Sequence, residues 1–227
     1  VELAVDYLAI SRYAEPPAPT SLAGALMAAG LGTSEYTVDE GASGGGRRRL
    51  GRHTLRASNL PVTGRVSLWR HTEGALATMG AAAFDTLTRG LNPDDAQTLR
   101  TGTLELSLRV KAIDALALPA LEWAMRVLRV LLDLTEGAAV DPAAQRCYGR
   151  ATVARLDGAD PLAHLAIHDE LWDADSRWLH THGMQKFGRP ELDLVGVPLS
   201  LEEDGLAFLR DVASSLARGA RLAAGQE

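Results

Sequence analysis

The clearest strand and the clearest helix of the chain lie near its middle and follow from the spacing of apolar side chains. Over residues 103–111, leucine and valine alternate with charged or polar residues, which predicts a half-buried strand. Over 116–134 the charged residues are spaced by four, three and four positions and fall on one side of an otherwise apolar segment. This stripe predicts an amphipathic helix over 118–136 and not a membrane span.

The rest of the chain is typical of short strands interrupted by few helices. A Gly- and Arg-rich segment at 41–51 predicts a flexible loop with a basic tip. The order of elements predicts a single α+β domain over 1–227, with mostly antiparallel sheet and helices packed on one face. We expect further strands over 3–12, 34–40, 52–60, 64–71, 162–172, 177–184 and 192–197, and further helices over 21–29, part of 74–90, 92–102 and 200–218.

An internal duplication is indicated by the pattern W-x-H-T-x-G, which occurs at 69–74 and again at 178–183. A similar succession of predicted elements precedes each copy. We therefore expect two related β-α-β-β-β halves, 1–100 and 101–227, around a pseudo-two-fold axis. In that arrangement His71 and His180 would flank the axis and could act as an acid and a base in catalysis.

Charge and cysteine content argue against some kinds of binding partner and indicate a cellular location. The 227 residues carry 23 Lys and Arg against 29 Asp and Glu, a net charge of −6. An acidic chain argues against binding to nucleic acid or to an anionic membrane. A single cysteine and the lack of a signal-peptide pattern in the first 30 residues predict a cytoplasmic protein. Abundant alanine, and arginine in preference to lysine, indicate a bacterial source.

A histidine cluster is the strongest candidate for chemistry. His180 and His182 are two apart on a predicted strand, so their side chains share one face, with Trp178 on the same face. Two imidazoles at this spacing can ligate one transition metal ion such as zinc, with a third ligand from the preceding strand. The third ligand depends on the register of the two strands. One register sets Asp169 opposite His180, and a slip by one residue brings His168 to one of the two histidines.

Two other interpretations of the same residues stay open. The cluster, with Glu170 beside it, could be a metal-free catalytic or ligand-binding site. Alternatively the histidines are packing groups, and the shared H-T-x-G pattern ends a strand where glycine takes a positive φ.

An arginine run, Arg47, Arg48 and Arg49, lies in the predicted loop with Arg52 close by. It could bind a phosphate or an acidic partner, although such a run is more often a solvated loop. The sequence contains no H-E-x-x-H, C-x-x-C, P-loop or EF-hand signature. The familiar metalloprotease, redox, nucleotide and calcium motifs are therefore missing.

The stretch Trp178-Leu179-His180-Thr181-His182-Gly183-Met184, continuing to Phe187-Gly188-Arg189-Pro190-Glu191-Leu192, resembles a segment of an uncharacterised bacterial α+β domain family. The resemblance extends over roughly the last 120 residues and includes Val140-Asp141-Pro142. It implies an α+β fold and carries no activity with it. Some such domains resemble small immunity or accessory proteins of bacterial conflict systems.

We accordingly expect a non-catalytic binding or interaction protein without a cofactor, whose partner is a protein or a small molecule and which could form a homodimer. The alternative is a small-molecule hydrolase or other enzyme that uses His180 and His182 with His168, Asp169 or His71, with or without a metal ion. A third hypothesis is an accessory domain whose Arg47–Arg49 loop docks on an acidic partner.

Overall fold

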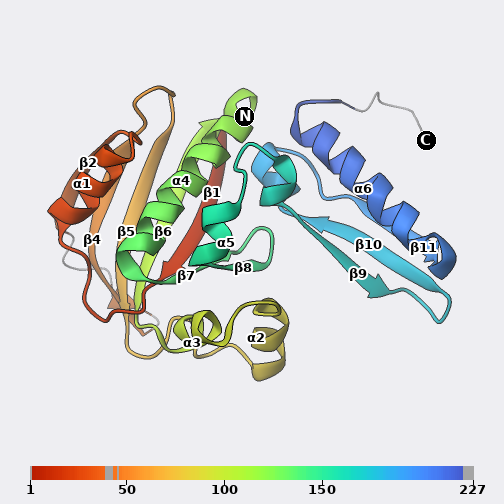
Figure 1. The fold of residues 1–227 in the computed structure, drawn as a ribbon, viewed down its shortest axis with the longest axis horizontal. Helices are drawn as coiled ribbons and strands as arrows, with labels where there is room; N and C mark the ends of the chain where they lie inside the picture. The colour runs from red at the N-terminus through yellow and green to blue at the C-terminus, as the bar shows by residue number, and fades with distance from the viewer. Residues whose placement is uncertain (1, 39–42, 45, 222–227) are drawn as a thin grey trace.

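Two antiparallel sheets form the framework of the chain (Figure 1). The computed structural model describes residues 2–38, 43–44 and 46–221. The large sheet has the strand order β2-β4-β5-β6-β1-β7-β8, and the short strand β3 pairs with β4 off this path. The small sheet has the order β11-β10-β9. The α+β class is thus confirmed.

The large sheet is built from β1 (Glu2–Ile10), β2 (Thr33–Val38), β3 (Ser43–Gly44), β4 (Arg47–Arg56), β5 (Thr63–His71), β6 (Leu104–Ile113), β7 (Ala138–Asp141) and β8 (Arg146–Gly149). The small sheet comprises β9 (Ala166–Leu171), β10 (Ser176–His182) and β11 (Asp193–Pro198). The helices are α1 (Pro19–Ala28), α2 (Ala81–Leu87), α3 (Pro93–Thr101), α4 (Ala117–Thr135), α5 (Arg150–Arg155) and α6 (Glu202–Ala217).

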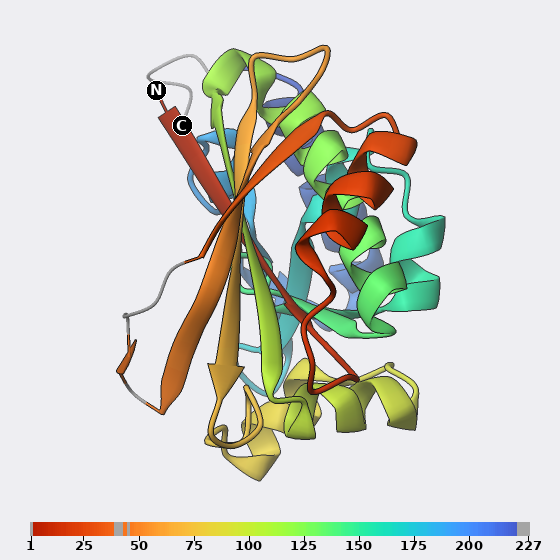
Figure 2. The ribbon, with the colours of Figure 1, turned by 90° about the vertical axis from the view of Figure 1, so that its left-hand side faces the viewer.

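The main core lies between one face of the large sheet and α4, with α1 and α5 beside it (Figure 2). Leu104, Leu106, Leu108 and Val110 of β6 are buried, as the alternation in the sequence predicts. Leu121, Leu128 and Leu131 of α4 are buried on the apolar side of the predicted amphipathic helix. Trp123 donates its indole Nε1–H to the carbonyl of Leu31 at 2.8 Å, which ties α4 to the segment after α1.

The opposite face of the large sheet is covered only at one end. There Ile10 and Val140 pack with Phe84 of α2 and Leu99 of α3 in a second apolar cluster. The rest of this face, over β4, β5 and β6, has no helix on it in Figure 2. The large sheet therefore has one face buried against helices and one face that is largely exposed and polar.

The small sheet packs on α6 through one face. A Cβ on Gly205 of α6 would lie 3.0 Å from the Leu179 side chain, so helix and strand approach closely here. In the turn that follows β10, the buried Lys186 forms an ion pair with the buried Asp141 at the end of β7. This ion pair links the segment after β10 to the large sheet.

Several boundaries differ from the sequence prediction. The predicted loop 41–51 is largely strand, since Arg47, Arg48 and Arg49 pair with His71, Arg70 and Trp69 across β4 and β5. Residues 39–42 and 45 of the predicted strand and loop lie outside the described residues. The first part of the predicted strand 162–172 is a 3-10 turn, because the Asp160 side chain accepts from the Leu162 N–H and Pro161 begins the turn.

The structure does not show the predicted pseudo-two-fold arrangement of two halves. Strands β6, β7 and β8 of the second half join the sheet formed by the first half. The two W-x-H-T-x-G copies lie at the ends of β5 and β10, in different sheets.

A shared local role accounts for part of the repeated pattern. The Thr72 hydroxyl donates to the Gly46 carbonyl, and the Thr181 hydroxyl donates to Glu191. Gly183 takes φ 104°, and a Cβ there would lie 2.8 Å from the His164 carbonyl oxygen. The pattern thus secures the end of a strand to its neighbour, and the positive φ expected of this glycine is present in the second copy.

Within the described ranges, no helix has the length and apolar character needed to cross a bilayer.

Buried His164 gives the fold a pH dependence. Its Nε2–H donates to the Gly158 carbonyl at 2.8 Å, and Tyr7 Oη lies 3.5 Å from its Nδ1. Burial lowers the pKa of His164 to about 4 from an ordinary value of 6.5. The unfolded chain therefore binds a proton at a pH at which the folded chain does not.

We expect the free energy of unfolding to fall as the pH drops from 6.5 towards 4, by about 3 kcal/mol from this residue. Denaturant unfolding at a series of pH values measures the slope. A His164→Gln variant should be less stable at neutral pH but should show a shallower slope. Equal slopes for both proteins would contradict the assignment.

Candidate metal centre

Three histidines meet on the face of the small sheet opposite α6. His180 and His182 are two apart on β10, and His168 of β9 pairs directly with His180. One potential ligand nitrogen from each residue lies within 4.8 Å of the other two. The ring centroids are 4.5 Å apart for His168 and His182, and 5.0 Å apart for His180 and His182. Of the two registers considered from the sequence, the structure has the one that brings in His168.

This geometry is close to that of a bound transition metal. Zinc binds imidazole nitrogen at 2.0–2.1 Å, so two nitrogens of a tetrahedral site lie about 3.4 Å apart. The potential ligand nitrogens lie within 4.8 Å of one another, so the widest pair has to close by about 1.4 Å at most to bind zinc. Three histidines leave the fourth tetrahedral position for water or substrate, as in catalytic zinc sites.

The surroundings favour the neutral imidazoles that metals bind. Burial lowers the pKa of His168, and the nearby His182 and His180 lower it further. The pKa of His182 is lowered by burial and then by His180. His180 is only 7% exposed, and within the described part of the chain its buried Nδ1 has no hydrogen-bond partner. A buried nitrogen without a partner is unusual in a folded protein and makes His180 a candidate ligand.

Two contacts around the cluster hold its rings in place. Trp178 stacks on His180 with ring centroids 4.1 Å apart, and its Nε1–H donates to Asp193 Oδ1 at 2.8 Å. The side-chain amide of Gln145 lies 3.3 Å from His182 Nδ1. The amide Nε2 of Gln145 donates to His182 Nδ1, which helps to hold this ring in place.

The end of β10 is fixed by a single carboxylate. Glu191 accepts hydrogen bonds from the Gly183 N–H, the Met184 N–H and the Thr181 hydroxyl. The strand that carries His180 and His182 therefore ends in a rigid loop, which favours a preorganised site.

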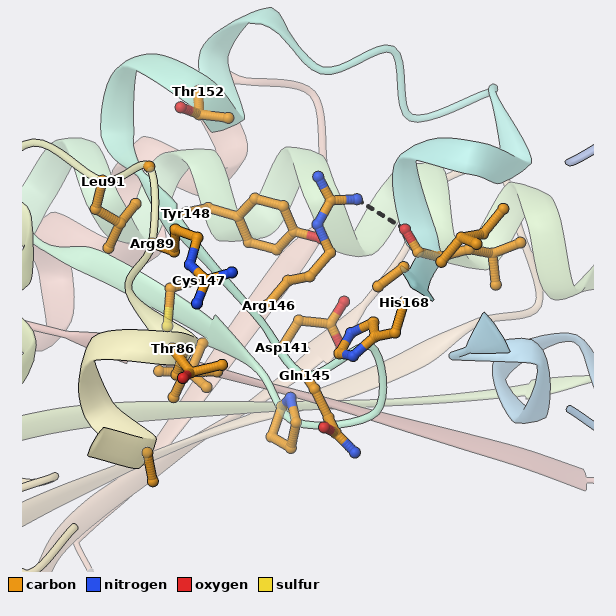
Figure 3. Close-up of a pocket in the computed structure, with 18 of the residues that line it drawn as sticks. Thr86, Arg89, Leu91, Asp141, Gln145, Arg146, Cys147, Tyr148, Thr152 and His168 are labelled. Atoms are coloured by element: carbon orange, nitrogen blue, oxygen red, sulfur yellow. Dashed lines mark hydrogen bonds between the residues drawn. The ribbon is translucent and has the colours of Figure 1, made fainter. Parts of the chain in front are cut away.

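A cleft of about 1430 Å³ reaches the cluster at one of its three histidines, His168. It lies between the α2 segment, the β7–β8 hairpin and β9, and His168 and Glu170 both line it. Figure 3 shows His168 beside Gln145, Asp141 and Arg146 at one end of this space. A cleft lined by apolar side chains with a few convergent polar groups is a common setting of a small-molecule site.

Cys147 also lines the cleft, but burial raises the pKa of its thiol to about 12. The thiol is then protonated at neutral pH and is a poor nucleophile.

The structure separates the remaining predicted site residues into two groups. Glu170 lies on the same face of β9 as His168, opposite Trp178. Asp169 is directed to the other face, where it lies 3.5 Å from Arg177 in an ion pair. The alternation of side chains along β9 explains why only one of these two carboxylates accompanies the histidines.

His71 does not join His180 across a shared cleft, contrary to the expectation from the duplication. It lies at the end of β5 in the large sheet, with Nε2 2.8 Å from Oε2 of the buried Glu105. Arg47 stacks over the neighbouring Trp69 at 4.4 Å and Arg49 at 5.5 Å, while Arg48 alternates to the other face of β4. The predicted arginine loop is therefore part of a sheet surface.

Sequence reasoning missed Gln145, Arg146 and Asp193. Gln145 and Arg146 belong to the β7–β8 hairpin, which the sequence gives only as an Arg-bearing loop far from the histidines. Asp193 begins β11, opposite His180. A correct pairing of all three small-sheet strands would have identified Asp193, whereas the first two depend on the packing of one sheet against the other.

The chain matches no protein-family model, and searches of curated proteins and of solved structures return no match.

Proposed function

We propose that the chain binds a divalent transition metal ion, with zinc the best fit, through His168, His180 and His182, and that it is a hydrolase acting on a small molecule in the adjoining cleft. The observation that carries this proposal is the convergence of three imidazole nitrogens within 4.8 Å from two paired strands. All three ligands are nitrogen donors, which suits zinc and other late first-row metals and not magnesium or calcium.

The residues around the cluster can act as a general base and can orient the metal ligands. A bound zinc ion would supply Lewis acidity and lower the pKa of a bound water towards neutrality. Glu170 lines the cleft on the histidine side and forms no ion pair among the described residues, so its carboxylate is available as a general base. Trp178 and Gln145 orient His180 and His182.

Metal titration tests the proposal. The untagged protein, stripped with a chelator and then dialysed, is titrated with Co²⁺ and with Zn²⁺. We expect saturation near one ion per chain, with the intense visible absorption of tetrahedral cobalt, and displacement of cobalt by zinc. Absence of saturable binding, or a weak octahedral cobalt spectrum, would refute the three-histidine centre.

Arg146 indicates that the substrate carries an anionic group. It lines the cleft, donates from one guanidinium nitrogen to the Leu165 carbonyl at 2.7 Å, and lies over the Tyr148 ring. These contacts hold the guanidinium in place while its other N–H groups remain available for an oxyanion. The exposed Arg89 and Arg210 line the same cleft.

We expect inorganic phosphate to bind the zinc-loaded protein, and Arg146→Met to weaken that binding by about tenfold or more while leaving the affinity for zinc within about twofold. Isothermal titration calorimetry measures both affinities. Arg155→Met, at the exposed end of α5, serves as the control. An equal loss of phosphate binding in both variants would refute the role given to Arg146.

A further inference from the structure

A cationic surface lies on the open face of the large sheet, away from the metal centre. We call it the basic face and define it as Arg52 and Arg56 of β4, Arg65 of β5, and Arg109 and Lys111 of β6. In strands, residues two apart share a face, and the ladder pairs place all five side chains on the side opposite α4. Figure 2 shows no helix over this side of β4, β5 and β6.

Three of the four arginines of the basic face form no ion pair with the residues that the structure describes. Arg109 is paired with Asp6, and Lys111 with Glu2. Arg52, Arg56 and Arg65 form no ion pair with any residue that the structure describes. A cluster of unpaired arginines in a chain of net charge −6 is a local reversal of the overall charge.

The position of Arg65 carries a direct energetic cost. It lies directly opposite Arg109 on the adjacent strand, and like charges in this position are destabilising; Asp6 offsets the charge of Arg109, but Arg65 has no such partner among the described residues. Serines or threonines occupy many of the other positions on this face. Threonine or serine at position 65 would avoid the repulsion, so arginine there points to a function outside the fold.

The borders of the basic face set the size of what can bind. Adjacent strands lie about 4.8 Å apart, and residues two apart along a strand lie about 6.5–7 Å apart, so the cations cover an area of only a few residues in each direction. Glu35 of β2 flanks it on one side, and Asp6 and Glu2 of β1 flank it on the other. These carboxylates confine the unpaired positive charge to Arg52, Arg56 and Arg65, an area that matches a short acidic segment better than a phosphate backbone extending across the sheet.

We propose that the basic face is a docking surface for an acidic segment of a protein partner, held by ion pairs between its carboxylates and Arg52, Arg56 and Arg65. Guanidinium groups bind carboxylates in a bidentate manner, and an open sheet face presents several of them at once. This interaction is independent of the metal centre, which lies on the small sheet.

The proposal is tested with a labelled dodecapeptide of alternating glutamate and serine, whose binding to the full chain is followed by fluorescence anisotropy. We expect saturable binding that weakens as salt rises, because exposed ion pairs are screened over a Debye length of about 8 Å at physiological ionic strength. The variant Arg52→Glu/Arg56→Glu/Arg65→Glu should bind at least tenfold more weakly.

The matched control is Arg12→Glu/Arg155→Glu/Arg218→Glu, which makes the same change in charge at exposed arginines elsewhere. It should bind the peptide within about threefold of the unaltered chain. Absence of binding by the unaltered chain, or an equal loss in both variants, would overturn the proposal. Tighter binding of a dodecameric oligothymidylate than of the peptide would overturn it in favour of a nucleic-acid surface.

Discussion

Replacement of His180 by alanine is expected to lower the affinity for zinc by more than about 100-fold. Loss of a residue that merely orients a ligand already costs about 10- to 100-fold, and His180 is the central ligand of the proposed site. His168→Ala and His182→Ala should produce losses of the same order. Competition against a chromogenic chelator measures the three affinities, with circular dichroism to verify that each variant is folded.

His71→Gln is the matched control, because glutamine can keep the hydrogen bond to Glu105 and the residue lies in the other sheet. It should bind zinc as the unaltered chain does. The unaltered chain should also gain thermal stability with zinc, by about 2.7 kcal/mol when free zinc is 100 times Kd. Unchanged affinity in all three variants, or an equal loss in His71→Gln, would show that the metal binds elsewhere.

The same site sets the pH range of metal binding. Protons compete with zinc for each imidazole, and the competition begins when the pH approaches the pKa of the ligand. Burial and the neighbouring histidines lower the pKa of His168 and His182 below 6.5. Zinc should therefore stay bound at a lower pH than an ordinary pair of exposed histidines would allow.

Local sequence patterns were sufficient to predict most of the strands and the long helix. Alternation of apolar and polar residues identified β6, and the charged stripe identified α4. Both signals reflect one buried and one solvated side of a single element, so they need no knowledge of the rest of the fold. The start of β4 was missed because Arg47–Arg49 follow a glycine-rich segment, and only their ladder with β5 makes them strand.

Candidate site residues could be predicted where they share a strand and not where they come from different elements. The spacing of His180 and His182 predicted directly that their side chains share one face of a strand. The choice between His168 and Asp169 required the register of β9 with β10, and a one-residue shift exchanges them. Gln145 and Arg146 reach the site through the packing of the β7–β8 hairpin against the small sheet, which no local pattern records.

Removing one partner of the ion pair between Lys186 and Asp141 is expected to cost the fold far more than removing one partner of an exposed ion pair. Both side chains are almost completely buried, and Lys186 also donates to the His164 carbonyl at 2.9 Å. Burial lowers the pKa of Lys186, while the charge of Asp141 and its hydrogen bond oppose that shift. Replacing Lys186 leaves a carboxylate in the interior without its counter-charge.

We expect Lys186→Met to lower the free energy of unfolding by about 3–5 kcal/mol. Lys111→Met breaks the exposed pair with Glu2 and should cost no more than about 1 kcal/mol, which makes it the control. The double variant Asp141→Leu/Lys186→Met should recover part of the loss, because it leaves no buried charge unpaired. Denaturant unfolding measures all three, and equal costs for Lys186→Met and Lys111→Met would contradict the assignment.

Because of its location, the ion pair between Lys186 and Asp141 should also affect zinc binding at the proposed metal centre. Lys186 follows β10 by four residues and Asp141 ends β7, so their contact fixes the strand of His180 and His182 against the large sheet. The cleft and Gln145 lie on the Asp141 side of this contact. At a temperature where Lys186→Met is still folded, it should therefore also weaken zinc binding and phosphate binding, whereas Lys111→Met should change neither.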